Sequence, residues 1–440
     1  MNSPKQPNFR RFLERWVRVE TSEIVAVVLA YVYFFSLLCT NYILRPIREE
    51  MGIAGGVENL QWLFTGTLVA MLTLVPLFGW VTARYSRKQF LPYVYYFFIA
   101  NILIFYTLFT SDIRHAYVAR AFFIWLSVFN LFVVSVFWSF MADIFSDPQA
   151  KRLFGFIAAG GTIGALTGPI LTAGLVGIIG ANGLLLIAAG LLCLPVLCIR
   201  GLAKWTTKSG IDRDPKKEAE SARPMGGSIF AGIPLVLKSP YLMGIGALIL
   251  LYSTLATFLY FEQAEIVRDT FSDPDDRIAL FAGIDFSTNA ITILVQVFFT
   301  ARIVERLGLA WALAIVPIGV AMGFLVLGFA PIFGVLIVMQ VLRRAGNFSL
   351  MKPAREMLYV ILGKEEKYKA KNFVDTVVYR GGDAVSGWAY TGLRAIGVSL
   401  AGVAFVAVPI AGIWAWVSYK LGKKNLELTA VAKTADQEHV

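Results

Sequence analysis

An arginine and an aspartate lie three residues apart inside a long apolar stretch near the C-terminus of the chain. They are Arg380 and Asp383, within residues 369–388. Arg380 lies about nine residues from the inner end of the predicted span, roughly 13 Å at 1.5 Å per helical residue, near the middle of a membrane. An arginine there needs a partner or a ligand, and Asp383 shares its helix face. The pair is either structural or an anion clamp, because a guanidinium offers a fork of donors suited to carboxylate and phosphate.

Other polar side chains occur at helical spacing inside apolar stretches. One set consists of Asp285, Asn289 and Gln296, and a second of Gln340, Arg343, Arg344 and Asn347. We expect Asn289 and Gln340 to line a polar path with Arg380. Asp285 or Asp383 could accept a proton or neutralise an arginine, and Asp375 is a further candidate for coupling or gating. Arg343 and Arg344 could instead extend to the cytoplasmic membrane surface.

Charged residues also mark the outer ends of two stretches. Arg45 and Arg48 end the first, and Glu262 and Glu265 occupy the corresponding place in the seventh. We hypothesise an outer gate in which Arg45 or Arg48 pairs with these acids when the cavity faces inward. The alternative is that they are solvated flanking charges. Arg45 and Arg48 are also candidates for attracting an anionic solute.

The sequence argues against an enzyme, a metal site or a cofactor. The two histidines, His115 and His439, have no nucleophile nearby in the sequence. No phosphate-binding loop of the GxxxxGK[ST] type is present. We therefore predict no catalytic residues, no metal ligands and no cofactor.

Twelve apolar stretches, each long enough to cross a bilayer, predict an all-α membrane protein with twelve transmembrane helices. They centre near residues 34, 71, 99, 130, 165, 190, 250, 289, 319, 341, 383 and 408. Most of the 40 Lys and Arg residues fall in alternate gaps, which predicts that both termini are cytoplasmic. The net charge of +11 is thus a signal of topology and does not indicate a nucleic-acid partner.

The stretches fall into two blocks of six around a polar linker. We predict an amphipathic cytoplasmic segment at 1–22, an N-terminal bundle at 23–200, a linker at 201–227, a C-terminal bundle at 228–419 and a cytoplasmic tail at 420–440. The blocks repeat at an offset of 218 residues, at which Thr82-Ala83-Arg84 recurs as Thr300-Ala301-Arg302. Two six-helix halves in a parallel repeat are the plan of a major facilitator type transporter.

Local motifs resemble that superfamily. Its loop motif is similar to GWVTARYSRK at 79–88, although Ala83 stands where an acid is usual. Its glycine and proline motif resembles Gly160, Gly164, Gly168 and Pro169. Glycines four residues apart let helices approach closely.

Longer runs resemble the nucleotide exchange carriers, the ATP/ADP translocase family, and more closely its short relatives in free-living bacteria. The runs are NYILRPIREEMG at 41–52, residues 137–161, and residues 353–383. The resemblance covers nearly all twelve stretches and implies exchange of ATP for ADP, with phosphate also implicated.

The charged residues of that family carry over incompletely. Its first-span lysine appears as Arg48. Its span-four glutamate falls near Leu126 or Asn130, its span-seven glutamate near Ala256 or Thr257, and its span-eleven lysine near Asp383. Three of these four charges are lost or reversed, so the resemblance implies the fold more than the substrate.

These observations predict a secondary active transporter of an anionic solute that works by alternating access and resembles ATP/ADP antiporters. One alternative is a proton-coupled transporter of another organic anion or drug. A further alternative is a membrane sensor or lipid-handling protein that transports nothing. We expect a monomer in the bacterial inner membrane whose partners are the bilayer and a small anion, ATP/ADP being the first candidate. The sequence leaves open the substrate, the coupling ion and the direction of flux.

Overall fold

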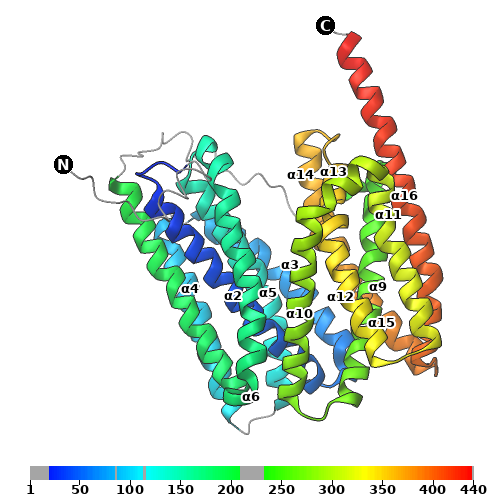
Figure 1. Cartoon of the computed structure of the whole chain (residues 1–440), viewed down its shortest axis with the longest axis horizontal. Coiled ribbons are helices and arrows are strands. Elements are labelled where there is room, and N and C mark those ends of the chain that lie inside the picture. The colour runs from blue at the N-terminus through cyan, green and yellow to red at the C-terminus, as the bar shows by residue number, and fades with distance from the viewer. Residues whose placement is uncertain (1–18, 85–86, 112–114, 209–231, 439–440) are drawn as a thin grey trace. The chain divides into compact units, whose positions relative to one another are not determined.

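The structure is a computed structural model that describes residues 19–84, 87–111, 115–208 and 232–438, and these residues form an all-α protein (Figure 1). The all-α prediction is therefore confirmed. The predicted amphipathic segment at 1–22 and linker at 201–227 fall mostly outside the described residues.

Within each described range, the helices follow one another with short connections. In the first half of the chain they are α2 (Ile24–Ala54), η2 (Val57–Asn59), α3 (Leu60–Arg84), α4 (Arg87–Thr110), α5 (His115–Ile144) and α6 (Asp147–Lys208). In the second half they are α8 (Ile233–Lys238), α9 (Pro240–Thr270), α10 (Pro274–Phe298), α11 (Thr300–Phe329), α12 (Phe333–Gly346), η4 (Asn347–Met351), α13 (Lys352–Leu358), α14 (Lys364–Phe373), η5 (Val374–Val378), α15 (Tyr379–Ala395) and α16 (Leu400–Glu438).

Eight helices in the described part of the chain are long and apolar enough to cross a membrane. One of them, α6, is 62 residues long and is broken at Gly180, where φ is 65°. Glycine adopts this left-handed region without the clash that a Cβ would cause. The break separates the stretches predicted near residues 165 and 190.

Two helices run further than the predicted boundaries. α6 continues to Lys208, past the predicted bundle boundary at residue 200, and α16 continues to Glu438, past the predicted boundary at residue 419. The end of α16, drawn in red, extends beyond the neighbouring helices of its unit (Figure 1). Lys, Leu, Glu and Ala are strong helix formers, and no glycine or proline follows Gly422 to end the helix.

Contacts divide the chain into two compact units. The first unit comprises the described residues of Met1–Met51, Leu77–Pro224 and Asp273–Phe286, and the second comprises those of Gly52–Pro76, Met225–Ser272 and Ser287–Val440. α3 and α10 each contribute to both units. These boundaries differ from the predicted bundles at 23–200 and 228–419, and the division into two bundles of six helices stays a prediction.

The core of the first unit depends on close contact between α2 and α6. A Cβ at Gly160 would lie 2.5 Å from the carbonyl oxygen of Tyr31, and one at Gly168 would lie 2.8 Å from that of Cys39. A Cβ at Gly164 would overlap the carbonyl oxygen of Phe35. The predicted role of these glycines in close helix approach is confirmed.

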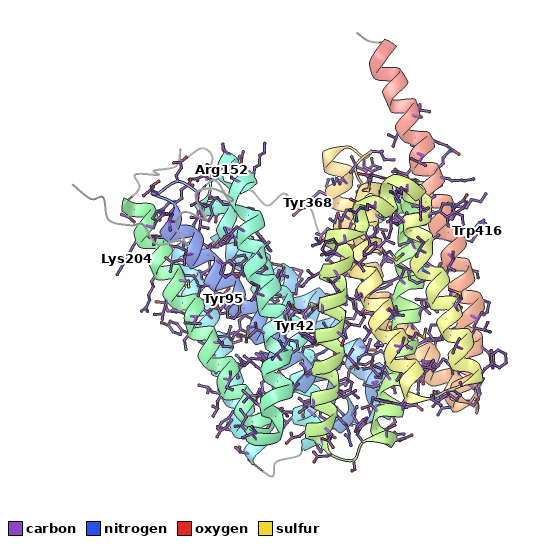
Figure 2. The ribbon with its side chains drawn as sticks, in the orientation of Figure 1. Tyr42, Tyr95, Arg152, Lys204, Tyr368 and Trp416 are labelled. Atoms are coloured by element: carbon purple, nitrogen blue, oxygen red, sulfur yellow. The ribbon has the colours of Figure 1, made fainter. Side chains whose placement is uncertain are left out.

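A buried carboxylate holds one end of the first unit together. Glu23, 2% exposed, accepts hydrogen bonds from Gln149 Nε2 (2.8 Å) and Arg152 Nη2 (2.9 Å). Its other oxygen accepts the Glu20 N–H (3.0 Å). Arg152 lies toward the same end of the unit as Lys204 (Figure 2). Burial alone would raise the pKa of Glu23, but these donors outweigh it and hold the pKa below its ordinary value of 4.5.

In the second unit α9 packs against α15 and α16, while α11 packs along α16. Trp414 of α16 is fully buried, and its ring lies 5.8 Å from that of Tyr252 on α9. This packing brings the polar face of α9 beside α15, which carries Arg380 and Asp383.

Gly164→Ala should lower the free energy of unfolding by about 1–3 kcal/mol, because the added methyl group meets backbone atoms that cannot move aside. Gly174→Ala on the same helix is the matched control, since a Cβ there meets nothing within 4 Å. Thermal unfolding of the purified proteins in detergent measures both. Equal stability of the two variants would show that α2 and α6 are not in close contact.

Glu23→Gln should cost about 1.5–3 kcal/mol at neutral pH, since it removes a charged acceptor of buried hydrogen bonds. Because the pKa of Glu23 is lowered by folding, its contribution is complete above the unfolded-state pKa and is lost as the pH falls through the folded-state pKa. The stability difference between parent and variant should therefore shrink on acidification. A difference that does not change between pH 7 and acidic pH would contradict this account.

Candidate functional site

Asp383 is fixed in the second unit by two helices. It is 6% exposed, and its Oδ1 accepts hydrogen bonds from the hydroxyls of Ser253 (2.6 Å) and Thr257 (3.4 Å) on α9. Its Oδ2 lies 3.3 Å from Arg380 Nη1. The ion pair predicted from the three-residue spacing is therefore formed. Gly382 permits this geometry, because a Cβ there would lie 3.0 Å from the Ser253 hydroxyl oxygen.

Arg380 pairs with this carboxylate, but the pair does not occupy all of its N–H donors. Its side chain is 32% exposed. A guanidinium has five N–H donors, and in the described structure Nη1 supplies the contact with Asp383. The remaining donors can bind an anion or water. The guanidinium also lies 5.2 Å from the ring centre of its neighbour Tyr379.

Arg343 is a second guanidinium in the same unit, buried on α12. Its Nε and Nη2 donate to Gln340 Oε1 (3.2 and 2.6 Å), and Gln340 Nε2 donates to Gln263 Oε1 (2.5 Å). It also donates to the hydroxyl of Tyr252. Among the described residues these partners are all neutral, so no carboxylate within ion-pair distance balances its charge.

The two arginines belong to one cluster. Both guanidiniums act electrostatically on Tyr379, whose ring stacks on that of Tyr252 with 6.0 Å between the centres. We define the arginine cluster as Arg343, Arg380, Asp383, Tyr252, Tyr379, Ser253, Gln263 and Gln340. Two guanidiniums and one carboxylate give it a formal charge of +1 at neutral pH. Such a cluster favours an anion.

Both arginines adjoin π-helical turns. η4 begins four residues after Arg343, and η5 ends two residues before Arg380. A π-helical turn inserts an extra residue and rotates the side chains that follow, and such turns are frequent at functional sites. The side chains after each turn therefore lie on other helix faces than a regular 3.6-residue period would predict.

The position of Arg343 decides between the two sequence interpretations. It is 8% exposed and lies in the protein interior, so the polar path is favoured over the alternative in which Arg343 extends to the membrane surface. Gln340 is in direct contact with Arg343. Sequence reasoning missed Tyr252, Ser253 and Gln263, because uncharged polar residues in an apolar helix carry a weak signal. The four-residue spacing of Ser253 and Thr257 is the one pattern that could have shown a polar face on α9.

Two outer-end charges of α2 have partners on α10 within the first unit. In the first unit Arg45 Nε lies 3.6 Å from Asp285 Oδ2, and Arg277 Nη1 donates to Glu50 Oε1 (3.0 Å). Both pairs join α2 to the first half of α10. Asp275, also on α10, accepts the Ala181 N–H just after the break in α6.

The contacts of Arg48 lie on its own helix and on α5. Its Nη1 lies 3.2 Å from Glu49, and its guanidinium lies 4.0 Å from the ring centre of Phe123.

Asp375 pairs with Arg355 of α13 (3.4 Å). Asn289 on α10 is buried.

The two acids of α9, Glu262 and Glu265, differ in their hydrogen bonding. Glu265 accepts hydrogen bonds from Arg394 Nη2 (2.8 Å) and the Tyr390 hydroxyl (3.0 Å), both on α15. Arg45 and Arg48 belong to the first unit and these acids to the second, and their pairing in an outer gate stays a prediction. Glu262 is 1% exposed, and neither of its carboxyl oxygens has a hydrogen-bond partner among the described residues.

Comparison with known families matches the chain twice. Residues 24–354 match the model of the Major Facilitator Superfamily, and residues 320–425 match the model of the TLC ATP/ADP transporter. The second region contains Arg343, Arg380 and Asp383.

Curated relatives are carriers from chlamydiae. ADP,ATP carrier protein 1 of Chlamydia trachomatis serovar D is 23% identical over 334 residues, which is 67% of this chain and 63% of that protein. ADP,ATP carrier protein 1 of Chlamydia muridarum is 22% identical over 348 residues, covering 69% and 66%. The alignments thus span less than two thirds of each relative.

Solved structures share the fold. A bacterial homologue of the iron transporter ferroportin in an inward-facing state has a TM-score of 0.65 at 14% identity, covering 92% of this chain and 100% of that one. A D-xylose-proton symporter has a TM-score of 0.61 at 12% identity, covering 92% and 99%.

Arg277→Gln should destabilise the protein by about 3–5 kcal/mol, because it leaves the buried Glu50 carboxylate without its charge partner. The double variant Arg277→Gln/Glu50→Gln should recover most of the loss. The control is Arg268→Gln, which breaks an exposed pair with Asp269 and should change stability by less than about 1 kcal/mol. Thermal unfolding measures these three variants and Glu50→Gln alone, and additive effects of the two substitutions would exclude coupling between Arg277 and Glu50.

Proposed function

The chain belongs to the Major Facilitator Superfamily and is a transporter of that type, and from this premise we propose that it moves an anionic solute across the inner membrane by alternating access. Both termini would face the cytoplasm, as the distribution of Lys and Arg predicts. The single observation that carries the anionic substrate is the formal charge of +1 on the arginine cluster.

The physical argument rests on the cost of an unbalanced buried charge. Arg343 is surrounded by neutral acceptors, and Arg380 shares its one carboxylate with two hydroxyl donors. A guanidinium without a counter-charge in a low-dielectric interior is costly. An anionic solute supplies that counter-charge, so the cluster favours solutes that carry negative charge.

Nucleotides are the first candidate solutes. The TLC ATP/ADP transporter match includes both arginines of the cluster, and the chlamydial relatives are named as ADP,ATP carriers. The phosphate groups of ATP and ADP suit the fork of donors on a guanidinium. In this proposal Arg343 and Arg380 bind phosphate, Gln340 positions Arg343, and Asp383 positions Arg380. Asn289 is a further binding candidate, and Arg48 keeps the family's positive charge in the first helix.

The charges joining α2 to α10 are candidates for gating. α2 belongs to the predicted N-terminal bundle and α10 to the predicted C-terminal bundle. The pairs Arg45–Asp285 and Glu50–Arg277 would therefore hold the outer ends of the two bundles together and separate when that side opens. Asp285 thus acts in this proposal as the counter-ion of Arg45.

Proton coupling of another organic anion is the second candidate, and Glu262 favours it. An ionised carboxylate without a donor is expensive to bury, so this group binds a proton while it stays dry. The charged and titratable groups that act on it are Glu265 on its own helix and Tyr390 and Arg394 on α15. Glu265 accepts hydrogen bonds from both of these donors.

Purified protein in detergent should be stabilised by ATP or ADP, by about 2.7 kcal/mol at a ligand concentration of 100 Kd. Arg343→Gln and Arg380→Gln should each weaken this binding about tenfold or more, since each removes a charged donor to phosphate. Arg200→Gln is the control, because Arg200 is an exposed residue of the first unit that donates to Tyr96. The measurement is the shift in unfolding temperature across a ligand titration.

Liposome counterflow then separates the two candidates. Uptake of labelled ADP stimulated by internal ATP supports exchange, whereas uptake of another anion driven by a pH gradient and lost in Glu262→Gln supports proton coupling. If no nucleotide, organic anion or phosphate stabilises the protein, or if both arginine variants bind like the parent, the anion proposal is wrong.

A further inference from the structure

A short helical segment between α10 and the main part of α11 is separated from both. Phe299 leaves regular helix geometry with φ −122° and ψ −34°, and Gly308 has φ 78° and ψ 168°. The segment at 299–307 therefore lies between α10 and the main part of α11, both within helices long and apolar enough to cross a membrane. It contains the triplet Thr300-Ala301-Arg302 of the internal repeat, for which the transport site gives no role.

One side of this segment lines a surface cavity of about 610 Å³ that is open to its surroundings. The lining residues are Phe299, Arg302, Ile303, Arg306 and Leu307. At 100° per residue these five positions fall within an arc of about 140° of the helix, with the two arginines beside a continuous apolar stripe. Cationic heads and apolar surface thus face the same space.

The arginines that line the cavity lack acidic partners. Arg302 Nη1 donates to the carbonyl oxygen of Phe298 (2.7 Å). Neither Arg302 nor Arg306 has a carboxylate within ion-pair distance in the part of the chain that the structure describes. Glu305, three residues after Arg302, is exposed and does not line the cavity. The guanidinium donors facing the cavity therefore remain available for an anion.

The apolar half of the lining excludes a simple dissolved anion as the best occupant. The Phe299 and Leu307 side chains are 54% and 50% exposed. Phosphate alone would leave both in contact with water, whereas a lipid covers them with its acyl chain. Helices with apolar residues beside Lys or Arg lie in the membrane interface in this way.

We propose that residues 299–307 form a binding site for an anionic phospholipid. Arg302 and Arg306 hold the phosphodiester of the headgroup, and Phe299, Ile303 and Leu307 contact the start of the acyl chains. The site lies in the second unit but uses none of the residues of the arginine cluster, so it does not depend on which solute is transported. It ties the connection between α10 and α11 to the surface of the bilayer.

The test compares lipids and phosphate on the intact, delipidated protein. Thermal unfolding is followed in detergent with added phosphatidylglycerol, phosphatidylcholine or inorganic phosphate. Phosphatidylglycerol should stabilise the parent, and Arg302→Gln/Arg306→Gln should weaken its apparent affinity at least about tenfold, because two charged contacts are lost. The matched control is Lys423→Gln/Lys424→Gln, which removes two positive charges from α16 and should bind phosphatidylglycerol like the parent.

Each other outcome overturns the proposal in a recognisable way. Equal stabilisation by phosphatidylcholine would mean that the apolar stripe alone binds lipid. Stabilisation by inorganic phosphate that is lost in the Arg302/Arg306 variant, with none from phosphatidylglycerol, would make the cavity a site for a soluble anion. Retention of the phosphatidylglycerol effect in the Arg302/Arg306 variant would place the lipid elsewhere. If the variant unfolds, Leu307→Ser replaces it, with the same expected loss of affinity.

Discussion

The cost of a charge in a low-dielectric interior is the constraint on which the polar organisation of this protein depends. Water is absent from the middle of a bilayer, and a buried ion is tolerated where another charge or several hydrogen bonds compensate it. Glu50 has Arg277, Asp285 has Arg45, and Asp383 has Arg380 together with the Ser253 and Thr257 hydroxyls. Each of these contacts joins neighbouring helices or neighbouring turns, so charge compensation and helix packing are the same set of interactions.

Departures from that rule are where function is expected. Arg343 is buried among neutral acceptors, and Glu262 is buried without a hydrogen-bond partner in the described residues. Neither arrangement is the most stable one available to a helical bundle, since an apolar residue of similar size would avoid the desolvation cost. An anionic solute would complete the first, and a proton would complete the second. A transporter needs such incomplete sites, because a solute gains no charge compensation by binding to a site that is already fully compensated.

Backbone geometry places these groups as much as side-chain chemistry does. The glycines of α6 let it touch the backbone of α2, and Gly382 lets α15 approach α9 closely enough for Ser253 to reach Asp383. The π-helical turns η4 and η5 adjoin Arg343 and Arg380 and change which way the following side chains point. Small residues and π-helical turns thus decide which polar groups meet.

The sequence by itself determined the all-α, membrane-spanning class of the protein and the Arg380–Asp383 pair. These depend on short-range rules: apolar length sets a spanning helix, and a three-residue spacing sets a shared face. Tertiary structure alone decided that Arg343 is buried, that Arg45 pairs with Asp285, and that Glu265 pairs with Arg394. Partners far apart in the chain are chosen by which helices pack together and by how kinks and π-helical turns rotate their faces. The regular helical period of a sequence shows neither which helices pack together nor how their faces are rotated.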